Sequence, residues 1–250
     1  MPGSAVFELR GVVHLVRPWG SPARDLDQLL SGIASAPAEV VFRHAVQHLL
    51  RHPGAEERAP DDFTSWIGGV VQDAETAERL SFEVQGGHST PEALRSALVS
   101  VLESIPGRKR LERDAPEGSA FGFLSATSLS FPTGVEVSDA GKLIDALMSA
   151  DAGVWFFHLI EQPFLSAGEA PLLDWLSWEG HERLACWLDE SAHAGLPIDI
   201  ARARLLKRWR QSHLGRRVAE AAQVPEDARR EVARQAMARF LRRRHSEGNS

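Results

Sequence analysis

The stretch FELRGVVHLVRPWGSPARDLDQLLSGIASAPAEVVFRHAVQHLL (7–50) recurs 114 positions later, without a gap, as FGFLSATSLSFPTGVEVSDAGKLIDALMSADAGVWFFHLIEQPF (121–164). Twelve of the 44 aligned pairs are identical, and they include Phe7/Phe121, Phe42/Phe156 and His44/His158. Self-similarity at a fixed offset is typical of a duplicated supersecondary unit. We therefore expect two related modules in tandem, and this duplication sets the architecture.

Each module is expected to begin with extended chain and to continue as helices. Apolar residues at two-residue spacing over 7–15 and 121–131 suit a half-buried strand or a short β-hairpin. The Pro and Gly residues after these segments are typical of turns: Pro18, Gly20, Pro132 and Gly134. Apolar stripes at helical spacing follow, and they predict one helix capped by Asp25 and another capped by Ser138 or Asp139.

Further helices are predicted in the same order in both modules. The apolar segments 40–50 and 154–165 suit buried helices, and Pro163 should end the second of them early. Helices are also expected around Glu-Arg-Leu at 78–80 and 182–184, and over 89–104, where Pro91 occupies the first turn.

The fold class is therefore α+β and predominantly α-helical. It comprises two tandem modules, each a short β-hairpin plus helices, and a basic helical extension at the C-terminus. The expected boundaries are 1–106 for the first module, 107–118 for a linker, 119–213 for the second module and 214–250 for the tail. We expect the segments around Phe42 and Phe156 to form the contact between modules or to line a groove there.

The runs FRHAVQHLL, DDFTSW, AERL and PEALRSAL resemble a bacterial and archaeal domain family of unknown function. That family's pattern is an aromatic-His pair, then Asp-Phe-x-x-Trp, then Ala-Glu-x-Leu. The chain departs from it at Arg43, which replaces the aromatic residue before His44, and at Asp174, which directly precedes Trp175. The resemblance implies two tandem copies up to about residue 213, and it carries no activity.

Charge is strongly segregated along the chain. Residues 1–201 carry 14 basic and 29 acidic side chains (net −15), whereas residues 202–250 carry 14 basic and 5 acidic ones (net +9). Such an asymmetry indicates a partner or docking between oppositely charged parts. The N-terminus resembles no signal peptide and no stretch is apolar enough to span a membrane, so we expect a cytoplasmic protein. Cys186, in ERLACWL, is expected to be buried.

His44 and His158 recur in both copies, and they could form a ligand-binding or acid–base pair near neutral pH. The alternative is that each fixes its helix through one buried hydrogen bond. His44 and His48 have the i, i+4 spacing of two metal ligands. The second copy has Gln162 in place of His48, however, and we expect neither a metal nor a cofactor.

Two acidic residues lie beside tryptophans, and a carboxylate next to an indole face could hold a sugar or a cation. These candidate ligand-binding residues are Asp62, Trp66, Asp174 and Trp175. The alternative is that each aspartate caps a helix.

The Arg-rich end could neutralise phosphates, with an aromatic side chain stacking on bases. The alternative is an amphipathic helix that docks on this protein or a partner. The candidate residues are Arg208, Trp209, Arg210, Arg216, Arg217, Arg242, Arg243 and Arg244.

Nucleophile elbows and phosphate-binding loops are absent from the sequence, which weighs against an enzyme. The preferred hypothesis is a non-enzymatic binding or adaptor protein that recognises a protein partner through the cleft between modules and through the basic helix. Binding of nucleic acid or an anionic surface through residues 202–245 is the first alternative. The second alternative is a small-molecule sensor or enzyme that uses His44 and His158, with a sugar as the candidate ligand. A homo-oligomer is compatible with all three.

Overall fold

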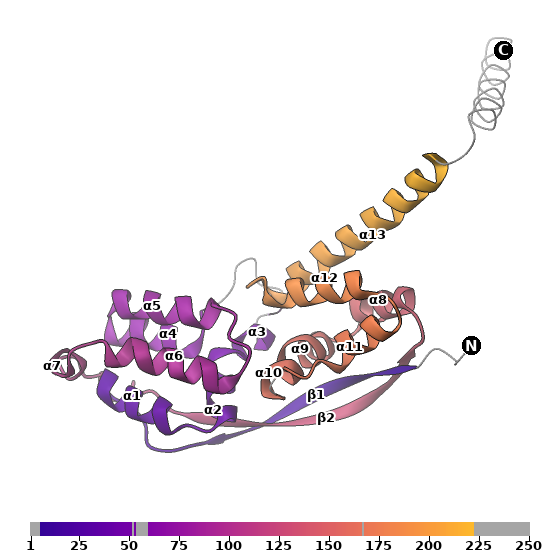
Figure 1. Cartoon of the computed structure of the whole chain (residues 1–250). Coiled ribbons are helices and arrows are strands. Elements are labelled where there is room, and N and C mark those ends of the chain that lie inside the picture. The colour runs from indigo at the N-terminus through magenta and orange to yellow at the C-terminus, as the bar shows by residue number, and fades with distance from the viewer. Residues whose placement is uncertain (1–5, 52, 54–59, 167, 223–250) are drawn as a thin grey trace, which may run out of the picture. The chain divides into compact units, whose positions relative to one another are not determined.

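Figure 1 shows a computed structural model of the chain, which describes residues 6–51, 53, 60–166 and 168–222, with side chains as far as residue 212. The described residues as far as Leu205 form one compact unit, and the described residues from Leu206 onward belong to a second.

The first half of the compact unit carries one strand and a series of helices: β1 (Phe7–Pro18), α1 (Leu26–Ser35), α2 (Ala38–Ala45), α3 (His48–Arg51), α4 (Asp62–Trp66), the π-helical turn η1 (Ile67–Val71), α5 (Ala74–Gln85), α6 (Pro91–Glu103) and α7 (Gly107–Arg110). The second half carries β2 (Leu124–Val137), α8 (Ala140–Ser149), α9 (Ala152–Phe156), the π-helical turn η2 (Phe157–Glu161), α10 (Gln162–Leu165), α11 (Pro171–Trp178), α12 (Glu182–His193) and the start of α13 (Ile198–Ala222). The α+β, mainly helical fold class is confirmed.

The two strands pair with each other in an antiparallel ribbon, so the expectation of a hairpin within each half is wrong. The apolar alternation in β1 runs on to Pro18 with no turn that would fold the strand back. At the centre of the ladder His14 pairs with Ser128, and these residues are 114 positions apart. If every residue number in the central ladder is replaced by its counterpart at the offset of 114, the same set of pairs results, with the residues of β1 and β2 exchanged.

Pro132 and Gly134 lie inside β2, so the turn predicted there is wrong. The pairing shifts at this point: Leu9 faces Val135, whereas its neighbour Arg10 faces Pro132. A bulge accommodates a proline, which has no N–H to donate, and a glycine with a φ of +76°. A bulge of this kind commonly bends its strand locally and increases the twist.

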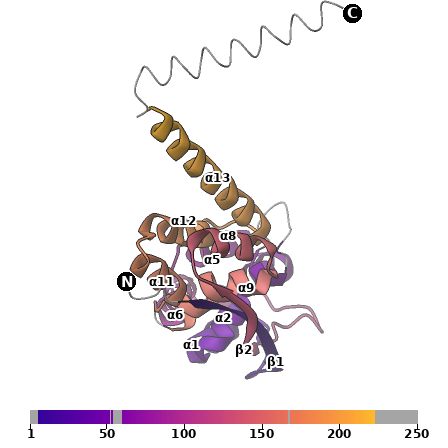
Figure 2. The same ribbon diagram turned by 90° about the vertical axis from the view of Figure 1, so that its right-hand side faces the viewer.

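Helices of the first half gather over one end of the ribbon and helices of the second half over the other (Figure 1). The two strands twist strongly about each other, as the view turned by 90° shows (Figure 2). Strong twist is usual for a ribbon of only two strands. Because each strand runs the full length of this arrangement, each one passes under the helices of both halves.

The helix starts were well predicted. Asp25 caps α1 by accepting from the N–H of Gln28, and Asp139 caps α8 by accepting from the N–H of Lys142. The segment after α9 does not end at Pro163 as expected. It passes through the π-helical turn η2, and Pro163 then falls in the first turn of α10, where no intrahelical N–H is needed.

The core of the compact unit contains Trp155, Phe42, Phe63 and Phe156, all fully buried. The ring centroids of Phe42 and Phe156 lie 5.8 Å apart, so the expected contact between the two halves is present. Cys186 is exposed on α12, with its Sγ 3.4 Å from Glu190 Oε1, and the expectation of burial is wrong. No described helix is both long and apolar enough to cross a membrane.

Candidate functional site

His44, on α2, is buried, and both of its ring nitrogens are in use. Its Nε2 accepts a hydrogen bond from the backbone N–H of Leu124 on β2 (2.8 Å). The proton must then reside on Nδ1, which donates to Asp62 Oδ2 (2.9 Å). Burial is the main cause that lowers the pKa of His44, and the hydrogen bond to Asp62 opposes it. The imidazole is held neutral as an acceptor for a strand.

His158, on η2, does the same for the other strand. Its Nε2 accepts from the backbone N–H of Arg10 on β1 (2.8 Å), and the side chain is 1% exposed. Burial, followed by the nearby charge of Arg10, lowers the pKa of His158 to about 4. Arg10 and Leu124 are 114 positions apart, as are the two histidines. The two hydrogen bonds are therefore equivalent, and each joins a helix of one half to the strand of the other.

The two histidines do not form a pair. Leu124 pairs with Pro18, eight residues along β1 from Arg10. At about 3.3 Å per residue the two anchoring points lie roughly 26 Å apart. The structure therefore does not bring His44 and His158 together as one acid–base or ligand-binding constellation.

The same exchange appears in the aromatic contacts. Phe121, just before β2, packs against His44 (4.8 Å between centroids) and Trp66 (5.7 Å) of the first half. Phe7, at the start of β1, packs against His158 (5.4 Å) and Trp175 (5.6 Å) of the second half. Each strand thus completes the core of the other half.

The remaining candidate residues separate into structural and exposed groups. Trp66 is buried and its Nε1 donates to the carbonyl of Ser119 (2.8 Å). Asp62 accepts hydrogen bonds from both His44 and Arg51. Burial alone would raise the pKa of the Asp62 carboxyl group, but its interactions with His44 and Arg51 outweigh burial, so the pKa is lowered. The capping alternative is wrong for Asp62, because Asp61 is the N-cap of α4.

Asp174 lies within α11, whose N-cap is Ala170, so the capping alternative is wrong here too. Asp174 is exposed, whereas the neighbouring Trp175 is 4% exposed. A carboxylate in solvent and a buried indole do not make a joint surface for a sugar. Within the described residues, no group of three or more His, Cys, Asp or Glu side chains could hold a metal ion.

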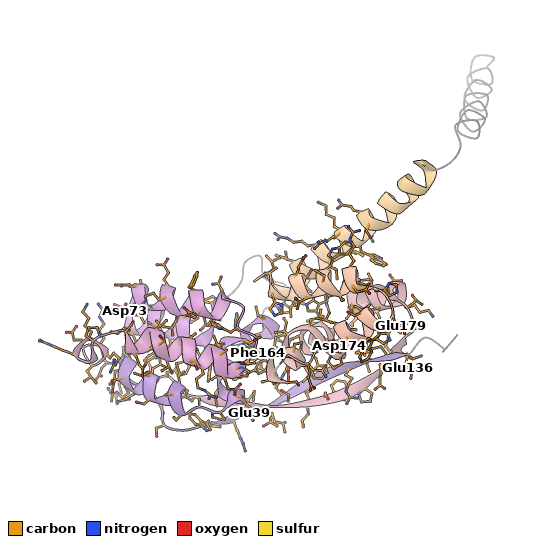
Figure 3. All side chains as sticks on the ribbon, in the orientation of Figure 1. Glu39, Asp73, Glu136, Phe164, Asp174 and Glu179 are labelled. Atoms are coloured by element: carbon orange, nitrogen blue, oxygen red, sulfur yellow. The ribbon has the colours of Figure 1, made fainter. Side chains whose placement is uncertain are left out.

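A cleft of about 220 Å³ lies between the two halves, and it is lined from both. Val46 and Ile160, 114 positions apart, lie on its walls beside Phe164, which Figure 3 places where the two groups of helices meet. Two histidines also line it, His88 from the loop after α5 and His193 from the last position of α12, and each lies near a carboxylate. His88 Nε2 lies 3.1 Å from Glu83 Oε2, and His193 Nδ1 lies 3.3 Å from Asp189 Oδ1.

Sequence reasoning missed a buried ionisable pair at the centre of the ribbon. His14 Nε2 lies 2.8 Å from Glu161 Oε2, and Glu161 is 1% exposed. The ring of His14 lies 6.3 Å from Phe42 and 6.4 Å from Phe156, so it is nearly equidistant from the two rings at the contact between the halves. A histidine inside an otherwise apolar strand, and a glutamate inside the apolar run after His158, were the signals that could have revealed it.

The basic candidates belong to the second unit. Arg208 and Arg210 are exposed on α13 and Trp209 is half-buried. Arg216 and Arg217 fall on α13 where only the backbone is described, and Arg242, Arg243 and Arg244 lie outside the described residues, as does the amphipathic stretch of the tail.

These features define a class of protein: helices in two groups on a shared two-stranded ribbon, with a cleft between the groups. The chain belongs to the family of unknown function (DUF5752), whose model matches residues 4–192, and the expected membership of such a family is confirmed. The fold is similar to that in the structure of OrfY from Thermoproteus tenax, with a TM-score of 0.66 at 22% identity, covering 82% of this chain and 96% of that chain. No curated protein matches the chain.

Proposed function

We propose that this chain is a non-catalytic binding protein, built from two tandem copies of one module, which recognises a partner through the cleft between the copies. Three relations at an offset of 114 support the duplication: the caps Asp25 and Asp139, the helices α1 and α8, and the two histidine-to-strand hydrogen bonds. The duplication explains the architecture of the chain, but by itself it does not indicate an activity. The cleft supplies the recognition surface.

The cleft carries the proposal because both copies build it. Its walls are mainly aliphatic and aromatic, and polar groups stand among them, including His88, His193 and Ser89. Binding sites commonly combine an apolar interior with a few placed polar groups, and they form preferentially where two structural units meet. At about 220 Å³ the cleft is small, which suits one or two apolar side chains from a partner protein better than a large ligand.

The catalytic alternative is less well supported by the same geometry. A general base needs an open nitrogen within reach of substrate. In His44 both nitrogens have protein partners, and in His158 the Nε2 accepts from a strand. Both imidazoles serve to hold the ribbon, and neither the cleft nor its rim includes them.

A test is to capture protein partners with the tagged full chain from native lysate, beside two matched variants. Ala192→Phe places a ring in the cleft from α12, whereas Ala203→Phe places the same ring on an exposed position of α13. We expect one stoichiometric protein to be retained by the unmodified chain and by Ala203→Phe, and lost by Ala192→Phe. A partner that binds all three equally, or capture of none, contradicts the proposal.

Nucleic-acid binding is the second candidate, and one observation favours it. Arg204, Lys207, Arg208 and Arg210 are all exposed on α13. Exposed basic side chains along a helix can neutralise phosphates without reading sequence.

A further inference from the structure

A second cavity, of about 440 Å³, lies at the bulged end of the ribbon. Leu9, Val13, Phe131 and Thr133 line it from the strands, and Ala146 and Ala150 line it from α8 and the residue that follows. It shares no lining residue with the cleft between the halves. A volume of several hundred cubic ångströms is ordinary for a small-molecule site.

The walls of this cavity are apolar surface left open to solvent. Val13 is 51% exposed, Phe131 is 46% exposed and Val135, also on the wall, is 43% exposed. The ring of Phe131 is held in place over Gly11, where an added Cβ would lie 2.7 Å from a ring carbon. Contiguous apolar surface around a concavity commonly marks a binding site.

The first half shows what fills the equivalent place. At the offset of 114, Leu9 corresponds to Phe123 and Thr133 corresponds to Trp19. The rings of Phe123 and Trp19 meet edge to face at 5.9 Å. Phe123 packs so closely on Gly32, the counterpart of Ala146, that no Cβ would fit there. Two aromatic rings fill this place in the first half, whereas the second half has leucine and threonine.

The cavity therefore lies where the first half has the rings of Phe123 and Trp19. Its counterpart shows that this backbone arrangement accepts an indole and a phenyl group together. Among the lining side chains the one ionisable group is Asp151, whose Oδ1 accepts from the N–H of Gly153 (2.7 Å). A carboxylate at this position disfavours an anionic ligand through like-charge repulsion.

We propose that this cavity binds a small aromatic molecule of the indole class, neutral or cationic. The inference goes beyond the binding function of the cleft, and it uses the proposed duplication to identify the residues that correspond. The ring would lie on Leu9 and Phe131, against the small side chains Ala146 and Ala150.

The test uses 5-fluoroindole and the full chain, observed by 19F NMR. We expect saturable binding with a Kd on the order of 1 mM or tighter, which is reasonable for a ligand of this size. The double variant Leu9→Phe/Ala146→Gly copies the packing of the first half and should weaken binding at least about tenfold. Ala192→Phe, which occupies the separate cleft, should leave the affinity unchanged.

A second variant, Ala150→Leu, also fills the cavity and provides an independent test if the double variant fails to fold. Melting curves show whether each variant is folded. Indole-3-acetate should bind more weakly than indole, because its carboxylate is repelled by that of Asp151. The Asp151→Asn variant should reduce this difference in affinity. Failure of the unmodified chain to bind 5-fluoroindole would overturn the proposal. Binding that survives both filling variants, or that is lost only in Ala192→Phe, would overturn it too, the latter by placing the ring in the cleft. Because the cleft proposal is read out by protein capture, the two proposals can fail separately.

Discussion

His44 accepts a hydrogen bond from the backbone N–H of Leu124, 80 residues further along the chain, and so a helix of the first half holds the strand of the second. His158 holds Arg10 in the equivalent way, in the opposite direction. The halves are therefore interlocked: each helical group is completed by a strand that the other half contributes. This exchange explains why a single compact unit spans the described residues as far as Leu205.

The state of His158 predicts how stability depends on pH. Its pKa is about 4 in the folded protein and about 6.5 when unfolded, so the unfolded chain binds the proton more tightly. The stabilisation is complete above pH 6.5 and is lost as pH falls towards 4, by about 3 kcal/mol. Urea titrations at pH 7.5, 5.5 and 4.5 measure this loss. His158→Gln should be less stable at pH 7.5 and should show a shallower pH dependence, and an unchanged dependence would contradict the account.

Gly32 is predicted to be intolerant of even a methyl group. Phe123 occupies the space that a Cβ would need, so Gly32→Ala should lower the free energy of unfolding by about 1–3 kcal/mol through overpacking. Gly69→Ala is the matched control, because an added Cβ there meets nothing within 4 Å. Chemical denaturation of both variants checks the difference, and equal effects would be inconsistent with close packing of Phe123.

The buried pair His14 and Glu161 has a built-in comparison, because its counterparts at the offset of 114 are Ser128 and Gln47. His14→Ser alone leaves the Glu161 carboxylate buried without its partner, at a cost of about 3–5 kcal/mol. The double variant His14→Ser/Glu161→Gln should recover most of that loss. A double-mutant cycle measures the coupling, and additive effects would show that the pair does not interact.

The nucleic-acid alternative predicts binding of a fluorescent oligonucleotide that weakens steeply between 50 and 200 mM salt, on the order of 10³-fold if about six phosphates are contacted. Truncation after residue 213 should reduce both the affinity and the salt dependence, because basic residues of the tail are removed. Affinity that is independent of salt would exclude this function.

Much of the local structure could be predicted from sequence because its signals are local. Asp25, Asp139 and Thr90 each precede an apolar helical stripe, and each caps the expected helix. The partner of a strand is not a local property. Alternation in 7–15 shows that a strand forms, and nothing nearby shows that it pairs with a segment more than a hundred residues away.

The candidate site was predictable in part. Recurrence of His44 and His158 identified residues with a shared role, and the contact of Phe42 with Phe156 followed from the same alignment. The two histidines anchor the ribbon by accepting hydrogen bonds from backbone N–H groups, and the sequence does not indicate which backbone N–H a side chain will meet. Asp62 and Asp61 are adjacent aspartates, and only the backbone angles decide which one caps α4.

The most direct test of the interlocked halves is to divide the chain within residues 107–118 and to study fragments 1–112 and 113–250 separately and mixed. Each half lacks the strand that completes its core, so we predict that neither fragment alone shows a cooperative thermal transition. Mixing should restore a 1:1 complex with the melting behaviour of the intact chain, as followed by circular dichroism and size-exclusion chromatography. Independent cooperative folding of either fragment, with no association on mixing, would contradict the account.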